Sequence, residues 1–386
     1  MTMAGHRTDS KFGRFTHYMP VRVFCGDDSV KANAGLFSGF GSRCLIVTGK
    51  SSAIKSGALA DVTEALSSCG ISWTVFDGIS QNPSLASCME AGKLAEDIQA
   101  DFIIGIGGGS ALDAAKAAAV FAANPSLDEA GFYGKDWAAD PLPIVLVGTT
   151  SGTGSEVTKV SVLTDSKGKK HSIHDDRLFA RAAFGDPRYT FALPRTVTLS
   201  TGIDVLSHCA ESYFSRKADE ISRAFAVRGI SLLIRPLRFA ADGGALTGAQ
   251  RAALYQASIL GGLAICGTGT CFPHNVGYYL TETYATPHGF ASAVFLPDML
   301  ALVREKNPEA HSRFFRELSL SEEELLQLVS ACLPAMEITM TEAEIETALP
   351  RWENNNSVKN TCCDVSTGEI KAILEKHFTK QKGAQT

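Results

Sequence analysis

The feature that most constrains the fold is an apolar run, a glycine-rich loop and an alanine-rich stretch in direct succession. Residues 101–109 read DFIIGIGGG, and residues 110–123 read SALDAAKAAAVFAA, which is rich in good helix formers. Comparable apolar runs cover 44–49, 71–78 and 141–150, and helical patterns separate them. Short apolar runs that alternate with helices of about ten to fifteen residues predict βαβ units and a parallel sheet.

The pattern changes near residue 195. The following segments, among them VLSHCAESYFS and GAQRAALYQASILGGLAIC, have apolar residues at helical spacing. We therefore predict an α/β domain over 1–195 and an all-helical domain over 196–386. The chain of 386 residues is long enough for two such domains. A site in the cleft between them would suit an enzyme with two substrates.

Composition predicts a soluble globular protein of the reducing cytoplasm. The chain is 45% hydrophobic and 20% charged, and its net charge of −5 argues against a nucleic-acid partner. Residues 1–15 lack the apolar segment of a signal peptide, and the apolar stretch 102–123 contains Asp113 and Lys116, unlike a membrane span. The ten cysteines include no CxxC pair, so we expect neither a thiolate zinc site nor a redox motif.

The glycine loop at 105–116, GIGGGSALDAAK, is a candidate phosphate site. Glycines allow the backbone to approach a phosphate, and a helix N-terminus offers free N–H groups. Ser110 can cap that helix, and Asp113 lies in its first turn. The loop is not the common GxGxxG fingerprint, because Ser110 replaces the last glycine. GKS at 49–51 is not a Walker loop, because Cys44 stands where its first glycine would be.

A second loop follows the strand predicted at 141–150. VGTTSGTGSEVT (147–158) is rich in hydroxyl groups and glycines, which can hydrogen-bond a pyrophosphate or a ribose. Taken alone, it also fits a polar turn between strands.

The helical half contains a candidate metal site. Asp204 and His208 in DVLSH are four residues apart, which a helix places on one face, and His274 and His288 follow beside Gly and Pro. Three imidazoles and a carboxylate can fill positions on Fe²⁺ or Zn²⁺. Because the chain has nine histidines, spacing alone also allows ordinary surface or core histidines.

Several motifs together resemble the iron-containing (group III) alcohol dehydrogenases. They are GIGGGSALDAAK, GTTSGTGSEVT, STGIDVLSHCAESYFS and PHNVGYYLTETYATPHG, with VTGKSS, NP at 82–83 and FGDP at 184–187. They occur in the family's order and cover about residues 15 to 375. The resemblance implies a dinucleotide-binding α/β domain, a helical domain and an active site between them. The implied activity is metal-dependent hydride transfer between a nicotinamide cofactor and a small alcohol or aldehyde.

The resemblance also implies a role for individual residues. Asp204, His208, His274 and His288 would hold one divalent metal, usually Fe²⁺ and sometimes Zn²⁺. The cofactor would contact Gly49, Asn82, Gly107, Gly108, Gly109, Ser110, Asp113, Thr149, Thr150, Thr153 and Lys170. Within that set, 107–110 would line the pyrophosphate, Asp113 and the threonines the nicotinamide side, and Lys170 the ribose.

Two positions depart from the family pattern. Tyr278 stands where many members have a second histidine that is thought to relay a proton, so no acid–base residue is assigned. We interpret Tyr278 as a pocket wall. Gly49 stands where some NAD-selective members have an acidic residue. With Lys50 beside it, this position favours NADP(H) and also admits NAD(H).

Alternatives remain open at this stage. A glycerol dehydrogenase or dehydroquinate synthase relative would share the fold, and a maleylacetate reductase would have an altered metal set. A non-catalytic nucleotide sensor would keep the fold without the chemistry. An interaction scaffold would need a broad exposed apolar stripe on the helices.

The substrate is not defined beyond small alcohols, diols and their aldehydes. We expect pocket residues near Phe272, Tyr279 and Thr281, a homo-oligomer such as a dimer, and neither a nucleic-acid nor a membrane partner.

Overall fold

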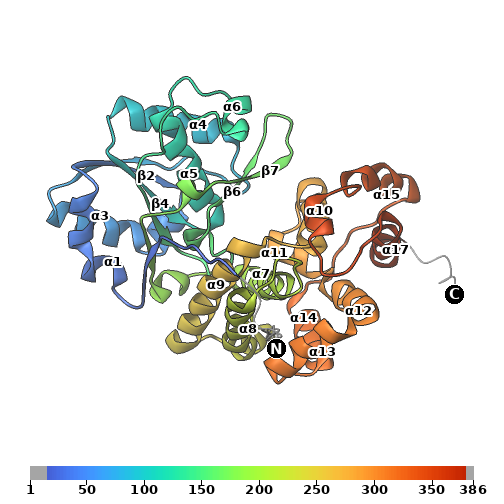
Figure 1. Ribbon diagram of the computed structural model, residues 1–386. Coiled ribbons are helices and arrows are strands. Elements are labelled where there is room, and N and C mark those ends of the chain that lie inside the picture. The colour runs from blue at the N-terminus through green and yellow to red at the C-terminus, as the bar shows by residue number, and fades with distance from the viewer. Residues whose placement is uncertain (1–14, 380–386) are drawn as a thin grey trace, which may run out of the picture.

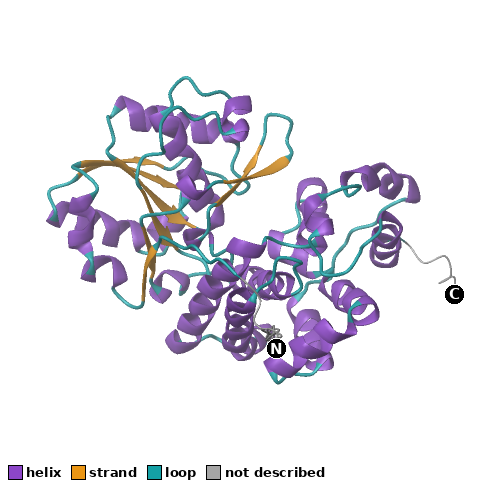
Figure 2. Cartoon of the chain, in the orientation of Figure 1, coloured by secondary structure: helices purple, strands orange, loops and turns teal. Residues whose placement is uncertain are grey.

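The computed structural model describes residues 15–379. Residues 1–14, which contain nearly all of the segment for which we predict no signal peptide, lie outside this range. Figures 1 and 2 show that the described strands gather in the first half of the chain, while the second half consists of helices and loops. The predicted fold class, an α/β half followed by an all-helical half, is confirmed. The boundary at 195/196 stays a prediction.

The α/β half is built on a parallel sheet of six strands in the order β1-β8-β5-β4-β2-β3. Its strands are β1 (Arg22–Cys25), β2 (Arg43–Thr48), β3 (Ser72–Phe76), β4 (Phe102–Gly107), β5 (Ile144–Gly148) and β8 (Ala182–Gly185). The four predicted strands correspond to β2, β3, β4 and β5. A separate antiparallel hairpin, β6 (Val160–Thr164) and β7 (Lys170–His174), was not predicted.

Helices cover both faces of this sheet because successive strand residues point to opposite sides. Leu45 and Val47 pack toward α4 and α5, whereas Cys44 and Ile46 pack toward α1 and α3. The helices of this half are α1 (Ser29–Ala32), α2 (Ser52–Lys55), α3 (Ala58–Ser68), α4 (Leu85–Asp97), α5 (Gly109–Ala123) and α6 (Glu129–Gly134). Short 3₁₀ turns add η1 (Ala34–Gly39), η2 (Ser155–Val157), η3 (Asp176–Leu178) and η4 (Pro187–Thr190).

The strand order creates a crevice at the carboxyl ends of β2 and β4. The chain leaves β2 toward β3 on one side and leaves β4 toward β5 on the other. Such a switch point is where open parallel sheets bind ligands. Gly49 follows β2 there, and the glycine loop follows β4, so the fold places both near this crevice.

The helical half surrounds one long central helix, α7 (Arg195–Tyr213). The other helices are α8 (Glu220–Ala241), α9 (Gly248–Thr268), α10 (Phe272–Tyr284), α11 (His288–Ala293), α12 (Leu296–Lys306), α13 (Pro308–Leu318), α14 (Glu322–Cys332), α15 (Glu342–Ala348), α16 (Asn356–Lys359) and α17 (Thr367–Phe378), with a 3₁₀ turn η5 (Leu349–Arg351). Every residue of α7 from Thr198 to Tyr213 except Thr201 is buried. Polar residues on α7 therefore lie inside the protein and need internal partners.

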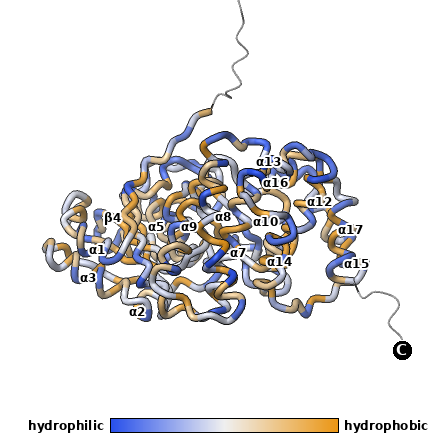
Figure 3. Tube along the Cα trace, turned by 90° about the horizontal axis from the view of Figure 1, so that it is seen from below, coloured by the Kyte–Doolittle hydropathy of each residue, from blue (hydrophilic) through white to orange (hydrophobic). Residues whose placement is uncertain are grey.

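A buried tyrosine joins the two halves. Tyr255 on α9 donates a hydrogen bond to Glu156 in η2 at 2.8 Å, and both side chains are buried. The ring lies against the ends of β5 and β8 at Gly148 and Gly185. In Figure 3 hydrophobic segments run along β4 and α9, and many residues of both elements are buried. The hydrogen bond between Tyr255 and Glu156, together with the packing of the tyrosine ring on the strand ends, thus holds α9 against the sheet.

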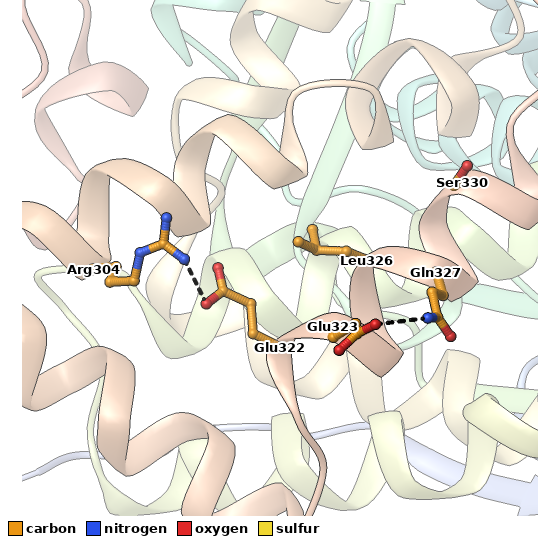
Figure 4. Close-up of a pocket in the computed structure, with 6 residues that line it drawn as sticks. All are labelled: Arg304, Glu322, Glu323, Leu326, Gln327 and Ser330. Atoms are coloured by element: carbon orange, nitrogen blue, oxygen red, sulfur yellow. Dashed lines mark hydrogen bonds and ion pairs between the residues drawn. The ribbon is translucent and has the colours of Figure 1, made fainter.

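The outer helices pack through the hydrophobic core of the helical half and are linked at the surface by an ion pair. Figure 4 shows a depression where Arg304 on α12 pairs with Glu322 on α14 at 2.9 Å, beside Glu323 and Gln327. Within residues 15–379 one large hydrophobic side chain of the helical half, Phe239, is well exposed, which gives the scaffold interpretation no support. No single helix in that range has the length and apolar content to cross a membrane; α9 and α10 reach them only jointly, across a bend of 108°.

Candidate active site

Three histidine side chains converge on one carboxylate oxygen in the centre of the molecule. Their Nε2 atoms lie 3.3 Å (His274), 3.8 Å (His208) and 3.9 Å (His288) from Oδ1 of Asp204. Asp204 Oδ1 and His274 Nε2 are buried and have no hydrogen-bond partner among the described residues. Buried polar atoms normally have a partner, and a shared cation would satisfy both of these. This donor set fits a divalent metal ion.

The four side chains come from three helices. Asp204 and His208 occupy successive turns of α7, as the i,i+4 spacing predicted. His274 lies in the first turn of α10, and His288 is the first residue of α11. Close packing of α11 on α7 depends on Gly289, because a Cβ there would lie 1.8 Å from the carbonyl oxygen of Ser200. The glycine of TPHG thus lets His288 reach Asp204.

His208 is the outlying member of the set. Asp204, His274 and His288 offer ligand atoms that all lie within 4.8 Å of one another, whereas His208 falls outside that group. Its ring stacks on His274 with centroids 4.7 Å apart, so it still lines the same site. The four-residue ligand set stays a prediction that this geometry supports.

Glu211 is a functional residue that the sequence analysis missed. Its Oε1 lies 2.5 Å from Nδ1 of His274, and its Oε2 accepts the backbone N–H of Cys271 at 2.7 Å. A carboxylate that holds one ring nitrogen fixes the ring and leaves the other nitrogen free for a metal. Glu211 lies seven residues after Asp204, and its place on the same face of α7 was the available signal.

Burial and charge set the protonation states of the site. Burial would raise the pKa of Asp204, but the charges of His208 and His288 outweigh it and lower that pKa. Burial lowers the pKa of His288 to about 3. For His274, Glu211 and Asp204 outweigh burial and raise the pKa to about 10. An ionised Asp204 and an uncharged His288 are the forms that bind a cation, and His274 would release its Nε2 proton when a metal binds.

The two glycine- and threonine-rich loops pack directly on each other. A Cβ at Gly109 would lie 2.6 Å from the side chain of Thr153, and the backbone N–H of Thr149 donates to Gly107 O at 2.9 Å. Gly109 is the first residue of α5, so the loop leads into a helix N-terminus as predicted. The predicted cap at Ser110 is wrong, because Gly108 holds the N-cap position and no side chain caps the helix, and Asp113 lies beyond the first turn. The close approach explains why a side chain at Gly109 would displace the threonine loop.

Lys116, a second residue that the sequence analysis missed, holds the threonine loop from behind. Its buried Nζ donates to the carbonyl oxygens of Ser155 at 2.7 Å and Val160 at 2.6 Å. Ser155 Oγ in turn donates to Asp113 at 2.5 Å, and the N–H of Val162 donates to the other Asp113 oxygen. Asp113 therefore ties α5 to η2 and β6, in addition to its predicted contact with the nicotinamide side.

A cavity of about 1190 Å³ connects the two sites between the halves. All four predicted metal ligands line it, together with seven of the predicted cofactor residues: Asn82, Gly109, Ser110, Asp113, Thr150, Thr153 and Lys170. Gly49, Gly107, Gly108 and Thr149 do not line it. These four residues lie behind the cavity wall or at the crevice, and their contact with the cofactor stays a prediction.

The prediction of which residues around α10 line the pocket was wrong. Phe272, Tyr279 and Thr281 do not line the cavity, whereas Asn275 and Tyr278 do. Phe272 belongs to the helical core, and Tyr279 packs on Trp352 with ring centroids 5.8 Å apart. The face of α10 that carries His274 points to the cavity, and neither aromatic residue is on it.

Tyr278 forms part of the wall beside the ligand set. Its ring stacks on His288 with centroids 5.5 Å apart, and Lys170 Nζ lies 5.7 Å from the centre of the Tyr278 ring. Burial, reinforced by Asp204 and Glu211, raises the pKa of Tyr278 above its usual range. The hydroxyl therefore stays protonated at neutral pH, and it can donate a hydrogen bond but is a poor base.

Comparison with known proteins agrees with this geometry. Residues 20–187 match the family model for the iron-containing alcohol dehydrogenases, and residues 198–375 match the model for the family's C-terminal region. The chain is 34% identical to sulfoacetaldehyde reductase of Bilophila wadsworthia (strain 3_1_6) over 302 residues, 77% of each chain. The chain belongs to the iron-containing alcohol dehydrogenases.

Further relatives show the same family. Long-chain-alcohol dehydrogenase 1 of Geobacillus thermodenitrificans is 36% identical over 281 residues, 72% of this chain and 71% of the relative. The crystal structure of an iron-containing alcohol dehydrogenase from Thermotoga maritima superposes with a TM-score of 0.87 at 33% identity, covering 95% of this chain and 99% of that chain. The protein is therefore a metal-dependent oxidoreductase that transfers hydride between a nicotinamide cofactor and a small alcohol or aldehyde. The predictions of family, fold and enzymatic activity are confirmed.

Proposed function

We propose that this alcohol dehydrogenase interconverts a short aldehyde and its primary alcohol, with Asp204, His208, His274 and His288 as the ligands of one Fe²⁺. The balanced reaction is aldehyde + NAD(P)H + H⁺ ⇌ alcohol + NAD(P)⁺. The observation that supports it best is the convergence of three Nε2 atoms on Asp204 Oδ1 within 3.3–3.9 Å. The donor set of three nitrogens and one oxygen also suits Zn²⁺.

Bound metal would supply Lewis acidity at the substrate oxygen, and the nicotinamide would carry the hydride. The residues of the chain orient these groups. Glu211 fixes the His274 ring, and the N-terminus of α5 offers N–H groups for the pyrophosphate. Thr150 and Thr153 face the cavity between the two sites, where the nicotinamide would lie. Asp204, His208 and His274 are buried, which limits the access of water to the reacting atoms.

We also propose that the enzyme accepts NADPH as well as NADH. Residues 49–52 read GKSS and contain no carboxylate that would repel a 2′-phosphate. Lys50 is exposed just beyond β2, at the crevice where the adenosine end of the cofactor would lie. Steady-state constants for both cofactors, measured on wild type and on Lys50→Ala, test this preference. A loss confined to NADPH supports the proposal, and equal constants in both proteins contradict it.

We propose a cytoplasmic location from the state of the cysteines. All ten cysteines are free thiols, which suits a reducing cytoplasm.

The edge strand β3 exposes Trp73 and Val75, each with 38% of its surface accessible. An edge of this kind can pair with a second copy of the chain, so we propose a homo-oligomer, a dimer in the simplest case. Light scattering on the purified protein decides the oligomeric state.

Metal analysis combined with a turnover assay tests the proposed function. The protein is purified without chelator, its metal content is measured by mass spectrometry, and oxidation of NADH or NADPH is followed with short aldehydes. We expect about one iron or zinc per chain and aldehyde-dependent oxidation, both lost in His274→Ala. If the wild type binds no metal and added Fe²⁺ or Zn²⁺ restores no turnover, the ligand assignment is wrong.

A further inference from the structure

The cavity between the two halves has an excess of positive side chains. Lysines at 159, 170 and 217 line it, against two carboxylates, Asp113 and Asp204. Asp204 belongs to the ligand set, and Asp113 already accepts hydrogen bonds from Ser155 Oγ and from the backbone of Val162. Neither carboxylate is therefore free to balance the lysines. An anion in the cavity would do so.

The hairpin β6–β7 shows where this charge lies relative to the nucleotide loops. At one end of the hairpin, Thr164 N donates to Pro83 O at 2.8 Å, beside Asn82 on the nucleotide side. At the other end, His174 pairs with Val160, next to Lys159. Lys159 and His174 thus lie at the end of the cavity that is remote from Asn82. The pyrophosphate, on the α5 N-terminus, does not account for them.

Lys217 brings a cation from the helical half to the same end. It follows α7, is exposed, and lines the cavity with Lys159 and His174. Burial lowers the pKa of His174, and the charges of Lys135, Lys159 and Lys217 lower it further, so His174 is an uncharged hydrogen-bonding group at neutral pH. Asp176 lies 2.6 Å from Lys159 and offsets part of its charge. Lys217 forms no ion pair with any residue between 15 and 379.

Uncharged hydrogen-bonding groups complete this end of the cavity. Those on the cavity wall are Ser172, Thr270, Asn356 and Ser357. Hydroxyl and amide groups beside cations are the usual surroundings of a bound oxyanion. A long hydrocarbon chain would instead require an apolar wall.

We propose that the substrate is a short aldehyde, or its alcohol, with an anionic group such as a carboxylate or sulfonate at the far end, recognised by Lys217 together with Lys159 and His174. This inference rests on the proposed function. The substrate oxygen faces the ligand set, and the anionic group faces the end of the cavity where the two halves each contribute a cation. Lys217 then acts as a specificity residue that selects the charged substrate and takes no part in hydride transfer.

The test compares substrates of equal length that differ in charge. Metal-loaded enzyme is assayed with 4-oxobutanoate, 3-oxopropane-1-sulfonate and butanal. In wild type we expect kcat/KM for an anionic aldehyde to exceed that for butanal by at least about tenfold, with the excess shrinking as salt is added. The carboxylate and sulfonate arms show which oxyanion is preferred.

Variants at position 217 separate recognition from folding. Lys217→Ala lowers the ratio of kcat/KM between the anionic aldehyde and butanal by roughly threefold to tenfold, mainly through KM, as expected for an exposed charge. Lys217→Arg retains the ratio. Lys55→Ala, which removes an exposed lysine on α2 away from the cavity, is the matched control and leaves both constants unchanged.

Two results would overturn the proposal. In one, wild type reduces butanal as efficiently as the anionic aldehydes; in the other, the ratio is the same in Lys217→Ala and wild type. In both cases turnover of butanal still upholds the proposed function. If metal-loaded enzyme reduces none of the three aldehydes with either cofactor, the proposed function fails, and this inference fails with it.

Discussion

The two halves of this enzyme build their parts of the active site in different ways. The α/β half relies on backbone: glycine positions let loops approach each other, and a helix N-terminus faces the cavity. The helical half relies on side chains: Asp204, His208 and Glu211 lie along one buried face of α7. The first site is lost when a side chain is added, and the second when one is removed.

The largest predicted effect is a loss of metal affinity when Glu211, the buried carboxylate that contacts His274, is replaced. Glu211→Gln keeps the size of the side chain but removes the charge that holds His274. We expect metal affinity to fall by about 10- to 100-fold, while the thermal midpoint of the metal-loaded protein changes little. Competition with a chelator measures the affinity. Unchanged affinity would show that Glu211 serves only the fold.

The next effect concerns the backbone site. Gly109→Ala places a Cβ 2.6 Å from the Thr153 side chain, so the threonine loop must move. We expect NADH affinity, measured by fluorescence titration, to fall by roughly tenfold or more, about 1.4 kcal/mol, with metal content unchanged. Gly35→Ala is the control, because a Cβ at Gly35 meets nothing within 4 Å. Loss of metal from Gly109→Ala would mean that the two sites are not independent.

The junction between the halves gives a smaller, global effect. Tyr255→Phe leaves Glu156 buried without its hydrogen-bond donor. We expect the free energy of unfolding to fall by about 1–3 kcal/mol, measured by urea denaturation. The accompanying double variant Tyr255→Phe/Glu156→Gln should recover part of this loss. If Tyr255→Phe is as stable as wild type, the hydrogen bond between Tyr255 and Glu156 contributes nothing to the free energy of unfolding.

The smallest effect lies far from either site. Lys376 and His377 on α17 hold the buried Asp298 of α12, and burial is outweighed by these partners, so the pKa of Asp298 is lowered. A carboxyl with a lowered folded-state pKa stabilises the protein above its unfolded pKa and ceases to do so as pH falls through the folded value. Asp298→Asn should therefore lower stability by about 1 kcal/mol near neutral pH. The difference in stability between Asp298→Asn and wild type should disappear below about pH 4. A difference that grows below that pH would contradict this prediction.

The sequence predicted the parts that local patterns determine. The strands β2–β5 came from apolar runs, and the i,i+4 spacing of Asp204 and His208 is a property of any helix. The meeting of His274 and His288 with α7 came only from the family resemblance, because it depends on how three helices pack. Lys116 was missed because an isolated lysine in a helix carries no signal until its burial is known. Glu211 was missed although its spacing of seven residues from Asp204 places it on the same face of α7.

The hairpin β6–β7 and the cavity wall were unpredictable for a related reason. Lys170 and His174 lie in a polar, lysine-rich stretch that reads as a loop, and the hairpin's contacts with α5 and α10 give it its place. Phe272 and Tyr279 were chosen for proximity in sequence to His274, but rotation about the axis of α10 points them elsewhere. Local sequence indicated the helix α10, whereas packing determined where the hairpin lies and which side chains of α10 face the cavity.

NADH titration of His274→Ala, with metal analysis on the same preparation, tests whether the cofactor site and the metal site are independent. If they are, metal content falls to background while NADH still binds with an affinity within about threefold of wild type, a difference below about 1 kcal/mol. If His274→Ala retains stoichiometric metal, the ligand set is wrong. If it loses NADH binding together with the metal, the claim of two separately built sites is contradicted.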